Sequence, residues 1–321
     1  SEGRAVVLDL EFRKLRGRLP NEVGMLTQLT SASFHSNSLE GTIPSFIYDS
    51  LTNLNYLDLS QNYFSSTISP DIAKLTNIKM LDLSELDLTG RIPIDAMKSL
   101  TALEDILITH SKKLSGPLLD LAVHWPNLSS FSVHTSGFTG TIPTTIGLNT
   151  KLEILVLHDT PMDVSKIPTE IGLLTNLQQF LVYPSNEPIE GGTIPTELGN
   201  CRDLEFLRIS GTRVSGTIPT ELGRLTNMIS LWLDGRMLTG TVPSEIGLMT
   251  NLGGLLIYDN EVEGSLPAEL GNIHNLNVLK VYRTRLSGKI PEGMCNSDSI
   301  QVIYGCDFET CGCCSLKCIH N

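Results

Sequence analysis

Apolar residues recur along this chain in the pattern L-x-x-L-x-L, in which the intervening residues are mostly polar. Leu54, Leu57 and Leu59 form one copy, and Leu276, Leu279 and Val281 form another. The alternation at the end of each copy is typical of a short strand with one buried face. An Ile-Pro pair or its equivalent follows each copy, and its second residue recurs about every 24 residues, as at Pro195, Pro219, Pro243, Pro267 and Pro291. A repeat this regular predicts a solenoid.

Each repeat combines one strand with one tight turn. The strand is too short to bury its own face, so we expect the next repeat to stack about 4.8 Å away and to supply both hydrogen bonds and core. Segments such as Pro-Thr-Glu-Leu-Gly, residues 195–199, suit a single helical turn. We expect proline at the first helical position, glutamate near the positive N-terminal end and glycine where the turn stops.

Together these segments give L-x-x-L-x-L followed by L-x-G-x-I-P-x-x-[LI]-G-x-L, which resembles the plant-specific leucine-rich repeat of receptor-kinase ectodomains, polygalacturonase-inhibiting proteins and secreted algal proteins. The match runs from about Ala5 to Ile303. The resemblance implies an α/β solenoid: a right-handed superhelix of about twelve repeats. This solenoid would consist of a concave parallel β-sheet, short 3-10 or helical turns on the convex side, and a weaker strand layer along the flank. We expect this solenoid to occupy residues 1–294 and a cysteine-rich C-terminal cap to occupy 295–321.

The chain departs from the family at the asparagine that follows the strand. Asn37, Asn62 and Asn260 keep it. Other repeats carry a hydroxyl or an unrelated side chain there, namely Ser136, Thr160, Thr212, Thr284, Leu86 and Arg236. We expect serine and threonine to replace some of the asparagine hydrogen bonds, and Leu86 and Arg236 to replace none.

The cysteines are concentrated at the C-terminal end. Six of the seven crowd the last 27 residues: Cys295, Cys306, Cys311, Cys313, Cys314 and Cys318. This density favours three disulfides and an oxidising compartment, with the pairing left open. A zinc knuckle is the alternative, but two clean C-x2-C pairs are missing. Cys201 replaces an apolar residue of other repeats, which indicates a buried free thiol.

The residues between and just after the strand leucines should face outward and vary most. In the N-terminal half they include acids: Asp9, Glu11, Asp58, Asp82, Glu85 and Asp105. In the C-terminal half they are mostly aromatic and cationic, with one acid, Asp234. We take them as the candidate binding residues: Tyr183, Phe206, Arg208, Trp232, Asp234, Tyr258, Lys280, Tyr282 and Arg283. Exposed Tyr, Trp and Arg are common at interface hot spots, and aromatic rings also suit sugars. An insertion, residues 183–192, should overhang this surface.

Other chemistry has weaker support. Known catalytic motifs such as G-x-S-x-G and H-E-x-x-H are absent from the sequence. Asp58, Asp82 and Glu85 could form a glycosidase pair, but acids on an open sheet are usually solvated. His110, His134 and His158 fall on successive repeats and are compatible with a metal, but three polar residues that line a groove are the favoured interpretation. Threonine precedes Ile-Pro in several repeats, including Thr193, Thr217 and Thr241, and this interrupted row makes ice binding a minor alternative. The strand propensity of threonine is sufficient to explain the row.

Composition narrows the function further. The net charge of −12 excludes the general positive field that binding to nucleic acid requires. We also find no apolar run long enough to span a bilayer. The sequon at Asn127 is a possible glycosylation site. We therefore expect a secreted or cell-surface, non-enzymatic recognition module that needs no cofactor and no metal and binds a protein or glycan on its concave face. A structural or adhesive subunit that assembles through its sides is the alternative.

Overall fold

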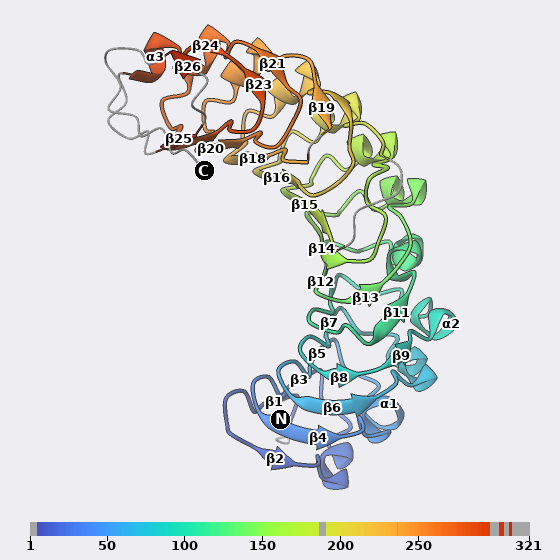
Figure 1. Ribbon diagram of the computed structural model, residues 1–321. Helices are drawn as coiled ribbons and strands as arrows, with labels where there is room; N and C mark the ends of the chain where they lie inside the picture. Colours follow the sequence, from blue (N-terminus) through green and yellow to red (C-terminus); the bar gives the residue numbers. More distant parts are fainter. Residues whose placement is uncertain (1–4, 186–190, 236, 296–301, 305–307, 310–321) are drawn as a thin grey trace. The chain divides into compact units, whose positions relative to one another are not determined.

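The computed structural model describes residues 5–185, 191–235, 237–295, 302–304 and 308–309, and Figure 1 shows its strands and turns. The chain divides into two compact units, residues 1–162 and 163–321. We call them the first and the second unit. Within each unit the same strand-and-turn module is stacked repeat upon repeat, so the repeat architecture predicted from the sequence is confirmed.

A parallel sheet runs through each unit, because each repeat contributes its L-x-L segment as one strand. In the first unit the neighbouring strands are β1 (Val7–Asp9), β3 (Ser31–Ser33), β5 (Tyr56–Asp58), β7 (Met80–Asp82), β10 (Asp105–Leu107), β12 (Ser130–His134) and β14 (Ile154–Thr160). In the second they are β15 (Gln179–Pro184), β16 (Phe206–Ile209), β18 (Ser230–Trp232), β20 (Gly254–Leu256), β22 (Val278–Lys280) and β25 (Val302–Tyr304). The register aligns equivalent residues of successive repeats, as in Arg208 opposite Trp232 and Trp232 opposite Leu256.

The predicted second strand layer is also present. It consists of short parallel strands at the L-x-G-x-I-P segments, in rows of four and three in the first unit and in pairs in the second. In the first unit these are β2 (Arg16–Gly17), β4 (Ser38–Gly41), β6 (Tyr63–Ser66) and β8 (Asp87–Leu88), then β9 (Gly90–Arg91), β11 (Leu114–Gly116) and β13 (Gly137–Phe138). In the second they are β17 (Gly216–Thr217) with β19 (Leu238–Thr239), β21 (Glu263–Gly264) with β23 (Arg285–Leu286), and β24 (Gly288–Lys289) with β26 (Phe308–Glu309).

Short turns close each repeat on the side away from the sheet. The first unit has η1 (Asn21–Met25), α1 (Phe46–Asp49), η2 (Pro70–Lys74), α2 (Ile94–Met97), η3 (Leu118–His124) and η4 (Thr144–Leu148). The second has η5 (Thr169–Leu173), η6 (Thr196–Asn200), η7 (Thr220–Arg224), η8 (Ser244–Leu248), η9 (Ala268–Asn272) and α3 (Glu292–Cys295). Most are 3-10 turns, whose length suits a connection of about five residues.

Two details of the predicted turn are wrong. Pro195 is the N-cap of η6 with extended backbone, φ −68° and ψ 137°, and its carbonyl oxygen accepts the first hydrogen bond of the turn from Leu198 N–H at 3.1 Å. Gly199 lies inside the turn and does not stop it. A Cβ there would overlap the backbone carbonyl of Glu221 in the next repeat, so this glycine permits close stacking of the turns.

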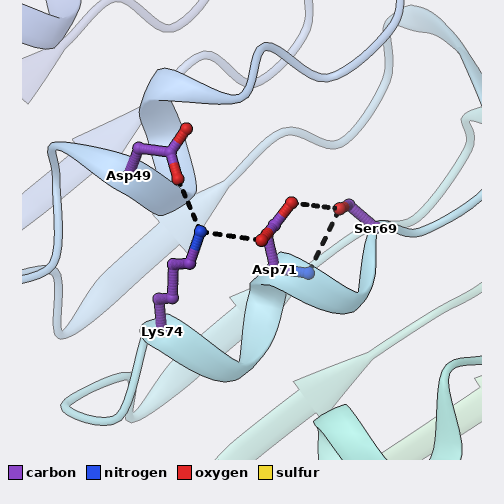
Figure 2. Close-up of polar contacts among 4 residues, drawn as sticks. All are labelled: Asp49, Ser69, Asp71 and Lys74. Carbon is purple, nitrogen blue, oxygen red and sulfur yellow. Dashed lines mark hydrogen bonds and ion pairs between the residues drawn. The ribbon is translucent and has the colours of Figure 1, made fainter.

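A polar brace joins adjacent turns on this side of the first unit, as Figure 2 shows. Lys74 Nζ lies 2.7 Å from Asp49 Oδ1 on α1 and 2.7 Å from Asp71 Oδ1 on its own turn. Ser69 caps η2 by accepting a hydrogen bond from Asp71 N–H at 3.1 Å. The hydrogen bond from Lys74, followed by that from Ser69, lowers the pKa of Asp71. The ions are half exposed, so the brace contributes mainly to the orientation of the turns.

Buried asparagines tie successive repeats together where the family pattern is kept. Asn62 Nδ2 donates to Phe34 O, Leu59 O and Ser60 O at 2.9–3.1 Å, and its Oδ1 accepts from Leu39 N–H at 2.9 Å. Asn37 and Asn260 make equivalent bonds.

The hydroxyls that stand in place of asparagine behave in two ways. Thr284 Oγ1 donates to Val281 O at 2.6 Å, so it replaces one of the asparagine bonds. Ser136 Oγ and Thr160 Oγ1 are buried and have no hydrogen-bond partner in the described part of the chain. The expectation that hydroxyls replace some of the asparagine hydrogen bonds is therefore confirmed.

The predicted C-terminal cap lies largely outside the described residues, and so do the side chains of its six cysteines. The boundary at residue 294, the disulfides and the zinc alternative stay predictions. Cys201 is a buried free thiol, as expected, and burial raises its pKa to about 12. Within the described ranges, every helix is too short or too polar to cross a membrane.

Candidate binding surface

The candidate residues of the second unit meet on the outer face of its sheet. Parallel pairing places Arg208 of β16 between Leu181 of β15 and Trp232 of β18. Phe206 lies one outward position earlier on β16 and pairs with Ser230. We define the aromatic patch as Tyr183, Phe206, Arg208, Trp232, Tyr258 and Tyr282, all of which are partly exposed.

Arg208 is held at the centre of this patch. Its guanidinium carbon lies 4.6 Å from the centroid of the Trp232 ring and 5.0 Å from that of the Tyr183 ring. Its Nε–H donates to Ser210 Oγ at 3.0 Å, and Ser210 Oγ–H donates to Asp234 Oδ1 at 2.6 Å. Aromatic contacts on the guanidinium and a hydrogen bond on its edge therefore fix the orientation of Arg208.

Asp234 was predicted as an outward binding residue, but it lies beneath the patch and is only 9% exposed. The strand ends at Trp232, so the chain has already turned inward at Asp234. Its carboxylate accepts a hydrogen bond from Ser210 and lies near the Tyr258 hydroxyl. Burial, then the Asp234 charge, raises the pKa of Tyr258 to about 12. Asp234 thus positions other members of the patch.

The aromatic rings use much of their flat surface within the protein. Tyr258 stacks on Tyr282 with ring centroids 4.7 Å apart and an interplanar angle of 13°. Trp232 has Arg208 against its ring, and its opposite neighbour in register is Leu256. Leu256 was expected to face outward but is only 5% exposed, because it lies in a row beside the larger Trp232. The patch therefore presents mainly ring edges and polar groups.

Two hollows open within the patch. An apolar hollow of about 340 Å³ lies on the sheet face and is lined by Gln179, Leu181, Phe206, Leu207, Arg208, Ser230 and Trp232. A larger hollow of about 600 Å³ lies where the strands end, and its lining includes Tyr183, Gly211, Asp234 and Tyr258. Gly211 is needed there, because a Cβ would lie 2.8 Å from Cε2 of Tyr183.

The remaining candidates flank the patch. Lys280 lies on β22 opposite Leu256. Arg283 follows the same strand, is exposed, and pairs with Asp259 at 3.4 Å. Residues 186–190 of the predicted insertion lie outside the described residues, so its overhang stays a prediction.

The polar face of the first unit is more buried than predicted. Asp58 is 7% exposed, and its Oδ1 accepts hydrogen bonds from Ser60 N–H at 2.8 Å and Ser60 Oγ at 2.5 Å. His35 Nδ1 lies 2.7 Å from the same hydroxyl. Burial, together with the charge of Asp58, raises the pKa of Asp82. The expected row of solvated acids is thus wrong at Asp58, which is a hydrogen-bonded structural group.

The three successive histidines do come together. The rings of His110 and His134 are 4.8 Å apart, and those of His134 and His158 are 6.3 Å apart. Burial, then the charges of His110 and His158, lowers the pKa of His134. Among the residues that the structure describes, no group of three His, Cys, Asp or Glu side chains could hold a metal ion.

The threonine row and the sequon have simple surroundings. A Cβ added at Gly240 would lie 2.9 Å from Thr217 Cγ2, so this threonine methyl packs over the glycine of the next repeat. This contact gives the row a structural role that needs no ice lattice. Asn127 is partly exposed and accepts a hydrogen bond from Lys151 Nζ at 2.7 Å through Oδ1. Its glycosylation stays a prediction.

Known proteins share both the sequence pattern and the fold. The family described as Leucine Rich Repeat matches residues 53–75. Receptor-like protein 35 of Arabidopsis thaliana is 32% identical over 124 residues, which are 38% of this chain and 13% of that protein. Receptor-like protein 1 of the same plant is 25% identical over 220 residues, 61% of this chain and 20% of that protein.

Solved structures agree over nearly the whole chain. The plant peptide hormone receptor RGFR1 in complex with RGF2 is 28% identical with a TM-score of 0.81, covering 95% of this chain and 52% of the receptor. The PEPR1–AtPEP1 structure is 30% identical with a TM-score of 0.77, covering 94% of this chain and 45% of that one. This chain thus spans about half the length of these two structures and a smaller share of the two receptor-like proteins. The chain has the leucine-rich repeat solenoid fold, and it resembles plant receptor-like proteins and receptor ectodomains.

Proposed function

We propose that this chain is a non-enzymatic recognition module that works outside the cytosol and binds a protein or peptide partner through the aromatic patch. The observation that carries the proposal is Arg208 held between Tyr183 and Trp232 on a sheet whose backbone is fixed by stacking. Aromatic and arginine side chains that are already ordered lose little conformational entropy on binding and are the commonest interface hot spots.

The geometry of the rings favours a protein partner over a glycan. A sugar ring would stack on an open aromatic face. Arg208 lies against the Trp232 ring, Leu256 is its neighbour on the other side, and Tyr258 and Tyr282 lie against each other. Ring edges, the Arg208 guanidinium and the apolar hollow remain for a partner, and these groups suit the carbonyl groups and side chains of a polypeptide.

Three observations support a location outside the cytosol. Six cysteines in a short tail are typical of disulfides formed in an oxidising compartment. Asn127 belongs to a sequon on a partly exposed segment. The resemblance to plant receptor-like proteins and to a plant peptide hormone receptor agrees with both.

Capture of a partner from the native source, with the full chain as bait, tests the proposal. Trp232→Ala should lose the captured partner, because it removes both the wall of the apolar hollow and the support of Arg208. Tyr63→Ala is the matched control, since Tyr63 is 60% exposed and lies on β6 in the first unit. A partner that Trp232→Ala retains as well as Tyr63→Ala does would refute the role of the patch.

A further inference from the structure

We propose that Arg208 is an anion receptor that binds a side-chain carboxylate of the partner, and that an apolar side chain next to this carboxylate enters the adjoining hollow. The inference rests on the proposed function and specifies the chemistry of its ligand: an extended polypeptide segment in which an acidic residue neighbours an apolar one.

The free donors of Arg208 carry the argument. Nε–H is used by Ser210, and the two aromatic contacts cover the guanidinium. The two Nη groups make no hydrogen bond to the described residues, and the side chain is partly exposed, so a ligand can reach them. A planar guanidinium with one fixed edge and unused Nη groups is arranged for a bidentate interaction with a carboxylate.

The hollow beside Arg208 explains why the ligand should also be apolar. Its volume of about 340 Å³ is large enough for one aliphatic or aromatic side chain, and Leu181, Phe206 and Trp232 supply apolar walls. Among the described residues that line the hollow, Arg208 alone is charged. A ligand that places an apolar group in the hollow therefore brings its neighbouring groups to the guanidinium, where a carboxylate is the complementary charge.

The surrounding charges leave this role to Arg208. Asp234 already accepts a hydrogen bond from Ser210, and Arg283 is paired with Asp259. The chain as a whole carries −12, so it offers an acidic segment no general attraction, and such a segment is favoured only where a local cation is available. The patch therefore offers selectivity as well as affinity for a carboxylate.

The experiment uses the full chain and tryptophan fluorescence. The chain has two tryptophans. Trp125 is 0% exposed, so a ligand in the hollow should change the emission of Trp232 alone. The probes are the blocked hexapeptide acetyl-Gly-Ser-Glu-Leu-Ser-Gly-amide, its glutamine twin, its Glu-Ser twin without the leucine, and trigalacturonate.

The parent peptide should change the Trp232 emission with a dissociation constant in the millimolar range. The glutamine twin should bind about tenfold more weakly or worse, as the loss of a charged hydrogen bond predicts. Arg208→Gln should remove the difference between the two peptides, and Arg208→Lys should restore it only in part because a lysine cannot form the bidentate pair. Arg224→Gln is the matched control outside the patch and should bind like the parent protein, because Arg224 is exposed on η7, on the side away from the sheet. Thermal melting verifies that each variant is folded.

Equal affinity for the glutamate and glutamine peptides, or no emission change with any peptide, would overturn the inference. Tighter binding of trigalacturonate than of the parent peptide, lost in Arg208→Gln, would also overturn it by assigning the site to a sugar acid. The native partner separates the two proposals. If Trp232→Ala loses the partner and Arg208→Gln keeps it, the recognition function stands and the carboxylate receptor fails. If both variants keep it, the recognition function fails as well.

Discussion

Replacing Asn62 by alanine tests whether the buried asparagines hold the stack together. In the folded chain this side chain serves one backbone N–H and three carbonyl oxygens. Two of the carbonyls keep a second partner, since Phe34 O also accepts from Asn37 Nδ2 and Ser60 O also accepts from Ser36 N–H. Among the described residues, the Leu39 N–H and the Leu59 carbonyl oxygen would then have no hydrogen-bond partner.

The magnitude follows from these two orphaned groups. Each buried, unsatisfied backbone group costs about 1–3 kcal/mol, so the free energy of unfolding of the first unit should fall by about 3 kcal/mol. For a unit of this size the melting temperature falls by about 2–4 °C per kcal/mol, which predicts a decrease of about 6–12 °C.

Calorimetry of the full chain measures this decrease directly. The matched control is Asn77→Ala, because Asn77 is exposed and makes one side-chain bond to Thr52 O at 3.2 Å. It should shift the free energy of unfolding by less than about 0.5 kcal/mol. A loss for Asn62→Ala no greater than that for Asn77→Ala would show that stacking and apolar burial hold the repeats without the asparagine.

Four further substitutions test other parts of the account. Thr160→Val removes an unpartnered buried hydroxyl, so denaturant unfolding should show no loss and a gain of up to about 1 kcal/mol; a clear loss would reveal a hidden partner. Gly223→Ala places a Cβ 2.5 Å from the carbonyl oxygen of Glu245 and should cost about 2 kcal/mol or more in the same assay. The folded chain lowers the pKa of His134 below 6.5, so its contribution to the free energy of unfolding is present above pH 6.5 and is lost as the pH falls through the folded-state pKa. His134→Gln should reduce this loss of stability in thermal melts below about pH 7. An unchanged pH dependence of the melting temperature would contradict this prediction. Asp234→Asn should lower the pKa of Tyr258 from about 12 toward 10.0 in a tyrosinate absorbance titration, with Tyr258→Phe identifying the signal.

The period of the apolar residues was enough to predict the repeat, the parallel sheet and the flanking strands. The predictions from the sequence were wrong where one residue type is compatible with more than one backbone position. Proline is compatible with both the N-cap and the first turn of a helix, and only the extended ψ of Pro195 decides between them. A glycine at this position predicts the end of the helical turn. Gly199 is instead required because the next repeat lies too close for a Cβ.

The candidate site was predictable as a set of residues and not as an arrangement. Alternation placed Arg208 and Trp232 on one face of the sheet, and the register put them side by side. The pattern could not show that Asp234 is buried, because a strand that ends at Trp232 no longer alternates. Nor could it show that the Tyr258 and Tyr282 rings stack, which depends on rotamers.

Iodide quenching of Trp232 in the free chain and in the chain saturated with its partner tests the central claim most directly. Trp125 is 0% exposed and should contribute a constant, unquenched background. If the aromatic patch is the binding surface, iodide should quench Trp232 in the free protein and lose most of that effect in the complex. Equal quenching with and without a saturating partner would contradict the account, because the partner would then bind elsewhere.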